Sequence, residues 1–368
     1  MNEIISDFNL SCLEKENSFV SYARKIKQQN KKLYIWGFGE GARRVSDYLS
    51  TAGIIHDGFV VNRLFFHHQN GVLCFEDLCD SALPKSLNFI ISVSSFDHEI
   101  FSSRESKIES MIQGDCWSEL YHIEGFRPIT YQWCENNYSR LHEFYSMLCD
   151  ELSRKTFLAF LNQKISKKMT YLKNVRQSEH YFDSNLVKLS PHEVFVDCGA
   201  YNGDSAVDFI NALHKRSFQT YDEIVSFEPS PENFKELVER NLQHHRCIQK
   251  GVSDIPGTVL FSSDNTRGVC NDREQGGFRI ETDTIDNVLA GGRATMIKMD
   301  IEGEELKALK GGTETIKKWV PVLAISIYHK PDDLITIPHF IKSLVANYKF
   351  FLRAYESMAT EVVLYAIP

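Results

Sequence analysis

A short apolar run followed by a glycine-containing turn constrains the fold more than any other feature of the sequence. Residues 194–198 are Val-Phe-Val-Asp-Cys, and Gly-Ala-Tyr-Asn-Gly follows directly. A continuous apolar run rich in β-branched residues is typical of a buried parallel strand, and residues 204–215 have a helical pattern. A strand, a glycine turn and a helix N-terminus in that order predict an α/β fold with a ligand-binding crevice at the carboxyl edge of its sheet.

The glycine turn differs from the one that holds a dinucleotide. Its glycines lack the G-x-G-x-x-G spacing that cradles a pyrophosphate, and an acid, Asp197, stands just before them. A carboxylate at that place would repel a pyrophosphate, whereas it would attract a cationic amino-acid group. We therefore predict S-adenosylmethionine rather than NAD as the cofactor. The candidate cofactor-binding residues of this segment are Asp197, Gly199, Ala200, Tyr201, Gly203 and Asp204.

Two further apolar runs also end in acids. Residues 224–227 lead to Glu228, and residues 295–299 lead to Asp300, each ahead of a helical pattern. Because the carboxyl ends of parallel strands meet at one edge of a sheet, we expect these acids to share one site. Glu228 is expected to accept the hydroxyl protons of a ribose, and Asp300 to lie beside the cofactor.

The region of residues 178–368 resembles the FkbM family of S-adenosylmethionine-dependent methyltransferases. The resemblance is carried by residues 195–204, 227–233, 251–254, 297–304 and 324–329, and its most distinctive part is the K-x-D-x-E-G-x-E pattern that begins at Lys298. It implies methyl transfer to a hydroxyl of a sugar, a glycoconjugate, a polysaccharide precursor or a polyketide. It also implies that Asp254 accepts a hydrogen bond from the adenine amine, while Ser253 offers a backbone N–H.

The end of the chain makes a specific prediction about the sheet. The last two expected strands, residues 348–355 and 361–367, are joined by too few residues for a crossover helix, so they should pair antiparallel. With the preceding strands this predicts the class I methyltransferase architecture, a Rossmann-like seven-stranded sheet with a terminal antiparallel hairpin. A further hairpin is expected between residues 257 and 281.

Two residues are candidates for the catalytic base that removes a proton from an acceptor hydroxyl. His329 follows the fifth expected strand, and the ordinary pKa of imidazole suits proton transfer near neutrality. Asp300 is the alternative base, and its other role would be to orient the acceptor hydroxyl or the cofactor's amino group. Asp300, Glu302 and Glu304 carry oxygen ligands of the kind that Mg²⁺ takes. However, acids at a helix start also stabilise the helix, and we predict no metal.

Residues 1–125 show a second, looser α/β pattern. Strand-like runs at residues 32–36, 58–62 and 88–94 alternate with helical ones, the last at residues 97–113, and predict a small Rossmann-like βαβαβα domain. The pattern resembles the N-terminal sugar-nucleotide-binding domains attached to some sugar acyltransferases. Its glycine turn suits a phosphate at a helix N-terminus, but Asn62 stands where an NAD enzyme places an acid. Ligand binding and a role as a dimerisation or substrate-presenting surface both stay open.

Residues 126–177 separate the two patterns and are largely helical, with apolar side chains three and four residues apart. We therefore expect three parts: a Rossmann-like domain (1–125), a helical linker (126–177) and a methyltransferase domain (178–368).

The composition limits the classes of partner and location. With 41 basic and 49 acidic side chains, the chain of 368 residues has a formal net charge of -8, which does not suit a general nucleic-acid binder. The start lacks the pattern of a signal peptide, no apolar run reaches membrane-spanning length, and the nine cysteines form no C-x-x-C pair. We expect a cytoplasmic protein with reduced thiols. Its acceptor is expected to be a small molecule or a glycoconjugate, and the N-terminal domain is a candidate surface for homo-oligomerisation.

Two other functions compete with an O-methyltransferase. An NAD-dependent sugar-nucleotide enzyme would need an acid in place of Asn62 and a Tyr-x-x-x-Lys pair, neither of which we find. A non-catalytic scaffold would have no need of acids at all three strand ends, and Asp197, Glu228 and Asp300 are intact.

Overall fold

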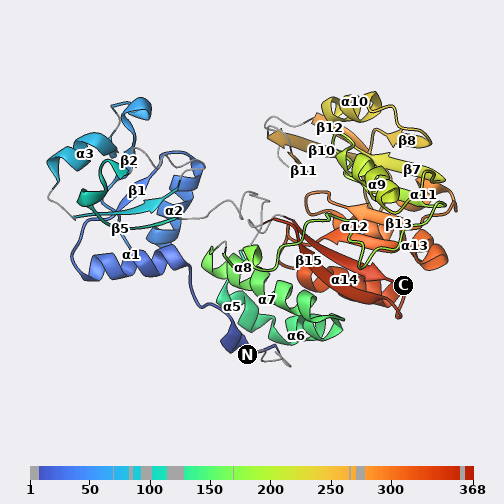
Figure 1. The fold of residues 1–368 in the computed structure, drawn as a ribbon, viewed down its shortest axis with the longest axis horizontal. Coiled ribbons are helices and arrows are strands. Elements are labelled where there is room, and N and C mark those ends of the chain that lie inside the picture. Colours follow the sequence, from blue (N-terminus) through green and yellow to red (C-terminus); the bar gives the residue numbers. More distant parts are fainter. Residues whose placement is uncertain are drawn as a thin grey trace.

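The computed structural model describes residues 8–68, 70–82, 86–92, 102–113, 128–168, 170–264, 267–270, 278–356 and 361–368. Figure 1 shows two α/β units, the N-terminal one in blue and the C-terminal one in yellow to red, with a group of green helices beside the C-terminal unit. Within the part of the chain that is described, no helix is both long and apolar enough to cross a membrane.

The N-terminal unit is a five-stranded parallel sheet with the order β3-β2-β1-β4-β5. Its strands are β1 (Tyr34–Trp36), β2 (Phe59–Val61), β3 (Val72–Cys74), β4 (Leu87–Ile91) and β5 (Ile108–Gln113). Its helices are α1 (Ser18–Gln28), α2 (Glu40–Thr51) and α3 (Phe75–Ser81).

One element of this unit differs from the prediction. The helix expected at residues 97–113 is wrong over its second half, because residues 108–113 form β5 and pair with β4. The hydroxyl of Ser110 donates to Oδ1 of the buried Asn88 at 2.8 Å, so the strand satisfies a polar group that a helix there would leave unpaired. Residues 97–101, the first part of that expected helix, lie outside the described residues.

The helical group packs against the C-terminal sheet. It consists of α5 (Tyr131–Asn136), α6 (Tyr138–Met147), α7 (Glu151–Ser166) and α8 (Thr170–Lys173), and its apolar side chains belong to the same core as the C-terminal sheet. Asp150 caps the N-terminus of α7 and forms an ion pair of 2.6 Å with the buried Arg353. The segment before α1 also joins this group, since Asn162 accepts from the N–H of Glu14 and donates to the carbonyl of Cys12.

The C-terminal unit is built on a seven-stranded sheet with the order β15-β16-β14-β13-β6-β7-β8. Its strands are β6 (Val194–Cys198), β7 (Glu223–Phe227), β8 (His245–Ile248), β13 (Met296–Met299), β14 (Val322–Ser326), β15 (Lys349–Ala354) and β16 (Val362–Ile367). Only β16 runs antiparallel to its neighbours β14 and β15. The accompanying helices are α9 (Asp204–Lys215), α10 (Pro231–Glu239), α11 (Ile285–Leu289), α12 (Glu305–Gly311), α13 (Thr313–Trp319) and α14 (Asp333–Leu344).

A second, four-stranded sheet lies beside the edge of the large one, with the order β11-β10-β12-β9. Its strands are β9 (Gly251–Val252), β10 (Gly257–Asp264), β11 (Arg267–Cys270) and β12 (Phe278–Asp283). The strand order of the large sheet places β6 in its interior, with β7 on one side and β13 and β14 on the other. The carboxyl ends of these four strands and the beginning of the antiparallel β16 therefore lie along one edge.

Candidate active site

A cavity of about 790 Å³ opens at this carboxyl edge of the large sheet. Its wall combines the loops after β6, β7, β13 and β14 with residues of the four-stranded sheet. Six of the predicted site residues line it: Gly199, Tyr201, Asp204, Glu228, Ser253 and Asp300. The other five are not among its described lining residues: Asp197, Ala200, Gly203, Asp254 and His329.

The glycine turn after β6 is fixed by backbone contacts. Gly199 has φ +81°, and a Cβ on it would overlap the carbonyl oxygen of Asp300, so only glycine fits between these two strand ends. The N–H groups of Gly199 and Ala200 both donate to the carbonyl of Phe227. Ala200 is fully buried and its N–H has a partner, so this residue supports the turn, and its contact with the cofactor stays a prediction.

Gly203 allows close packing of two helices and does not line the cavity. It adopts φ +86° where α9 begins, and a Cβ on it would lie 3.0 Å from the side chain of Leu237. The helix α9 can therefore approach α10 closely, while Gly203 itself does not reach the cavity wall.

The acid before the glycines forms a buried ion pair. The Asp197 side chain is 0 % exposed, and its Oδ1 lies 3.0 Å from Nζ of Lys298, its neighbour in register on β13. Lys298 also donates to the carbonyl of Gly199 at 2.6 Å. Burial alone would lower the pKa of Lys298, but the Asp197 and Asp300 carboxylates raise it, so the lysine stays charged. Lys298 already pairs with Asp197, and the expectation that Asp197 complements the cofactor's cationic group directly stays a prediction.

Glu228 is held rigidly at the end of β7. Its two oxygens accept the backbone N–H groups of Tyr201 and Ser230, at 2.9 and 2.8 Å. Burial raises the pKa of Glu228 to about 7, against the lowering effect of these hydrogen bonds. The carboxylate lines the cavity in a fixed orientation. A group that accepts hydrogen bonds from two hydroxyls requires such an orientation.

Of the two residues in the loop after β9 that were predicted to bind the cofactor, only Ser253 lines the cavity. Ser253 lines the cavity, but its N–H donates to the carbonyl of Asp283 at 2.9 Å. This N–H is therefore already engaged, and its contact with adenine stays a prediction. Asp254 is exposed, accepts from the hydroxyl of Ser253 at 3.2 Å and does not line the cavity, so its contact with adenine is not supported either.

Asp300 is surrounded by donors. The hydroxyls of Tyr181 and Tyr328 donate to its two oxygens at 3.0 and 3.1 Å, and Nε2 of His329 lies 3.4 Å from Oδ1. Burial alone would raise the pKa of Asp300, but the charges of His329 and Lys298 together with the two tyrosines lower it. An ionised carboxylate with its lone pairs engaged in this way is a weak base, and it is well suited to orienting a neighbouring group.

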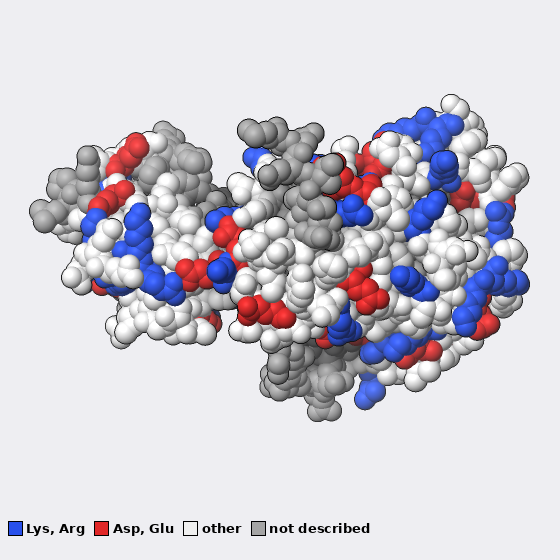
Figure 2. Space-filling view, turned by 90° about the horizontal axis from the view of Figure 1, so that it is seen from below, with Lys and Arg blue, Asp and Glu red and all other residues white. Residues whose placement is uncertain are grey.

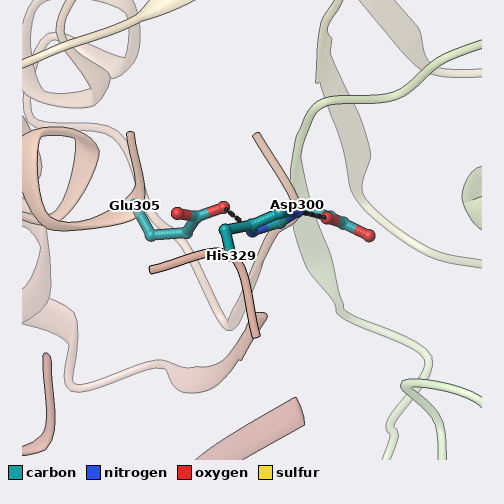
Figure 3. Close-up of side chains that lie close together, drawn as sticks. All are labelled: Asp300, Glu305 and His329. Carbon is teal, nitrogen blue, oxygen red and sulfur yellow. Dashed lines mark ion pairs between the residues drawn. The ribbon is translucent and has the colours of Figure 1, made fainter. Parts of the chain in front are cut away.

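His329 is not the exposed base that the sequence suggested. Its side chain is 1 % exposed, and Figure 3 shows the ring lying between Glu305 and Asp300. Nδ1 is 3.1 Å from Oε1 of Glu305, and Nε2 is 3.4 Å from Oε2 of Glu302. Burial alone would lower the pKa of His329, but Glu305 and Glu302 raise it well above its ordinary value. Both ring nitrogens therefore face carboxylates, and the general-base role of His329 stays a prediction that this buried position does not favour.

Asp300, Glu305 and His329 are close enough to one another to be considered as metal ligands. The imidazole, however, separates the two carboxylates rather than facing a common centre with them (Figure 3). Its positive charge offsets part of the negative charge of Asp300, Glu302 and Glu305 around it.

The sequence prediction missed several residues of this site: Lys298, Glu305, Tyr328, His180 and Glu361. It also missed that Tyr181 donates a hydrogen bond to Asp300. A signal existed for Lys298, because a lysine within an apolar strand beside an acidic strand neighbour is a candidate for a buried pair. Tyr328 directly precedes His329 after β14.

Comparison with known proteins agrees with this fold. A crystal structure of methyltransferase FkbM from Methylobacillus flagellatus KT matches with a TM-score of 0.69 and 19% identity, covering 96% of this chain and 94% of that chain. An rRNA methylase from Streptococcus thermophilus matches with a TM-score of 0.32 and 12% identity, covering 48% of this chain and 87% of that one. No curated protein matches the sequence at a significant level.

The fold is thus the α/β fold of methyltransferases, with parallel sheets. Residues 197–352 match the model of the methyltransferase FkbM domain.

Proposed function

We propose that the protein is an S-adenosylmethionine-dependent O-methyltransferase whose acceptor is a hydroxyl of a sugar, a glycoconjugate or a polysaccharide precursor. The observation that carries the proposal is the rigid carboxylate of Glu228 in the same cavity as the glycine turn and Asp300. The roles that we assign to individual residues below rest on this geometry and on the match of residues 197–352 to the methyltransferase FkbM domain.

The residues near β7 fit the donor. Oε2 of Glu228 accepts only the N–H of Tyr201 among the described groups, which leaves it a lone pair for a ribose hydroxyl. Oε1 accepts the N–H of Ser230 and, at 3.5 Å, the side-chain amide of Asn233, and a second ribose hydroxyl would displace this long contact. Val252, Leu260 and Ile280 add apolar surface from the four-stranded sheet, suited to the face of an adenine. The cofactor supplies an electrophilic methyl group, and the protein mainly positions the acceptor for in-line attack.

The residues near β13 and β14 form the acceptor half of the proposed site. Asp300 is fixed by Tyr181, Tyr328 and His329, so its carboxylate can orient an acceptor hydroxyl without changing its own position. Asp204, Glu302 and Glu304 also line the cavity, and a wall this rich in carboxylates suits a hydroxyl-bearing acceptor better than a polyanion.

The surface charge supports an acceptor other than nucleic acid. The net charge is -8, and on the face drawn in Figure 2 basic and acidic side chains are interspersed without forming one basic field. In this proposal the N-terminal unit presents the acceptor or joins two copies of the chain.

Isothermal titration with S-adenosylhomocysteine and, separately, with NAD tests the proposal. We expect saturable binding of S-adenosylhomocysteine that Glu228→Ala weakens, and no binding of NAD. Binding of NAD alone would favour a sugar-nucleotide enzyme, and binding of neither would favour a non-catalytic scaffold. Methyl transfer to a panel of sugars and glycoconjugates then identifies the acceptor.

A further inference from the structure

A second histidine lies in the cavity wall, far more accessible than His329. His180 and Glu361 both line the cavity, and Nε2 of His180 lies 3.2 Å from Oε2 of Glu361. The His180 side chain is 33% exposed, against 1% for His329. A histidine held by a carboxylate on one nitrogen and open to a cavity elsewhere has the arrangement of a general base.

The His180 ring is fixed by its neighbours. It stacks on the ring of Tyr181 at 3.8 Å between centroids and 18° between planes, and it contacts Tyr355 at 4.6 Å. Tyr181 in turn donates to Asp300. The imidazole is therefore connected through one aromatic ring to the carboxylate at the end of β13, and its position does not depend on a flexible side chain.

The strand order separates His180 from the proposed donor end of the cavity. Glu361 precedes β16, two strands beyond β13, whereas Glu228 ends β7 on the opposite side of β6. The charged and titratable groups around His180 are Glu361 before β16, Asp208 on α9, Tyr181 beside it and Tyr355 after β15. Both of these acids favour a positive charge on the ring once it has taken up a proton.

We propose that His180, positioned by Glu361, is the general base for the acceptor hydroxyl; this rests on the proposed function. The acceptor oxygen forms its bond to the methyl carbon while the carbon–sulfur bond breaks and its electron pair stays on sulfur. The hydroxyl proton passes to Nδ1 of His180, because Nε2 faces Glu361. The charge that appears on the imidazole is compensated by the Glu361 carboxylate, and the products are a methyl ether, a neutral thioether and an imidazolium.

The proposal is testable before the acceptor is known, by NMR of the His180 ring in two complexes. Sinefungin carries an ammonium group where the donor carries its methylated sulfonium, whereas S-adenosylhomocysteine is neutral at that place. If His180 lies within reach of the transferred methyl, the ammonium will disfavour the imidazolium. We expect the pH at which the His180 signal titrates to be about 0.5–1 unit lower with sinefungin than with S-adenosylhomocysteine.

His180→Gln assigns the signal, and it should leave the affinity for S-adenosylhomocysteine within about threefold of wild type. His192 is the matched control, because its Nδ1 lies 3.2 Å from a carboxylate, that of Asp222, but it does not line the cavity. Its titration should be the same in both complexes. Equal titration of His180 in the two complexes would overturn the role of the base while leaving the donor site intact. Failure of both ligands to bind in calorimetry would instead overturn the proposed function, and the base with it.

Discussion

The two α/β units of this chain contain the same strand-turn-helix segment, but the turn and the neighbouring strand ends differ between them. In each, an interior parallel strand, β1 or β6, is followed by a glycine turn and a helix of 12 residues. The turn after β6 is tight: Gly199 has φ +81° and lies against the carbonyl of Asp300. The turn after β1 is looser, because Gly39 has φ -75° and a Cβ on it would meet nothing within 4 Å.

The ends of the neighbouring strands differ as well. Glu228 after β7 is fixed by two backbone N–H groups and faces a cavity, whereas Asn62 after β2 accepts a hydrogen bond from the indole of Trp36 at 3.1 Å. The C-terminal unit also contains buried charges, which stabilise one arrangement of the strand ends. The comparison teaches that the strand-turn-helix pattern provides a place for a site, and that the side chains at the strand ends give that place its chemistry.

The largest expected effect is the loss of the buried Asp197–Lys298 pair. Lys298→Met leaves Asp197 uncompensated in the core and should lower the free energy of unfolding by about 3–5 kcal/mol, measured by urea denaturation. Lys27→Met removes a partly exposed partner of Asp57 in the N-terminal unit and should cost about 1 kcal/mol or less. The double variant Asp197→Asn, Lys298→Met should recover much of the loss. Equal stability of the two single variants would contradict the difference between the units.

His329→Leu tests the second buried charge. Because the pKa of His329 is raised in the folded state, its stabilisation is complete below the unfolded pKa and is lost as the pH rises through the folded pKa. At pH 6 we expect His329→Leu to cost about 3 kcal/mol, and the difference from wild type should shrink in alkaline solution. His192→Leu, at an exposed histidine, should change stability by no more than about 0.5 kcal/mol. A difference that grows with pH would show that His329 is neutral in the folded protein.

The two glycine turns offer a direct substitution test. Gly199→Ala combines a positive φ with overlap on the Asp300 carbonyl and should destabilise the protein by about 2–3 kcal/mol. It should also abolish binding of S-adenosylhomocysteine. Gly39→Ala has room and an ordinary φ, so stability should be unchanged or rise by up to about 1 kcal/mol. Thermal unfolding and calorimetry of both variants check this, and equal behaviour would mean that the turns are equivalent.

The sequence predicted the large-scale arrangement of the C-terminal unit well because that arrangement follows from local patterns. Apolar runs closed by acids place Glu228 and Asp300 at one edge of a parallel sheet, and the structure brings both to the same cavity. The sequence patterns do not contain how deeply a side chain is buried or which charge it meets. Asp197 pairs with Lys298, about a hundred residues later in the chain, and His329 lies beside Glu305 on α12, which precedes β14.

Such pairs depend on strand register and helix packing, which periodicity does not contain. The same reason explains β5, where pairing with β4 and the contact between Ser110 and Asn88 outweighed a helix-like pattern. The partner of the Ser253 N–H, the carbonyl of Asp283, also lies on a neighbouring strand of the small sheet, a contact that sequence spacing does not reveal.

Substitutions at the two strand-end residues, Glu228 and Asn62, should differ in their effect on the affinity for S-adenosylhomocysteine. Glu228→Ala removes the acceptor of two proposed ribose hydrogen bonds and should weaken binding of S-adenosylhomocysteine at least about tenfold. Asn62→Ala, at the corresponding strand end of the N-terminal unit, should leave that affinity unchanged. Calorimetry on both folded variants distinguishes them, and a normal affinity of Glu228→Ala would remove Glu228 from the donor site.

The smallest expected effect is a pH dependence of the same affinity. Burial raises the pKa of Glu228 to about 7 in the unliganded protein, and hydroxyl donors bind the ionised carboxylate better than the neutral acid. Binding must therefore expel a proton below pH 7, so the affinity for S-adenosylhomocysteine should be about tenfold weaker at pH 6 than at pH 8. Glu228→Gln, which cannot ionise, should bind more weakly than wild type at pH 8 and show a nearly flat profile. A wild-type affinity that stays level or increases toward pH 6 would mean that Glu228 meets its ligand as the neutral acid, which would reverse its assigned role from acceptor to donor.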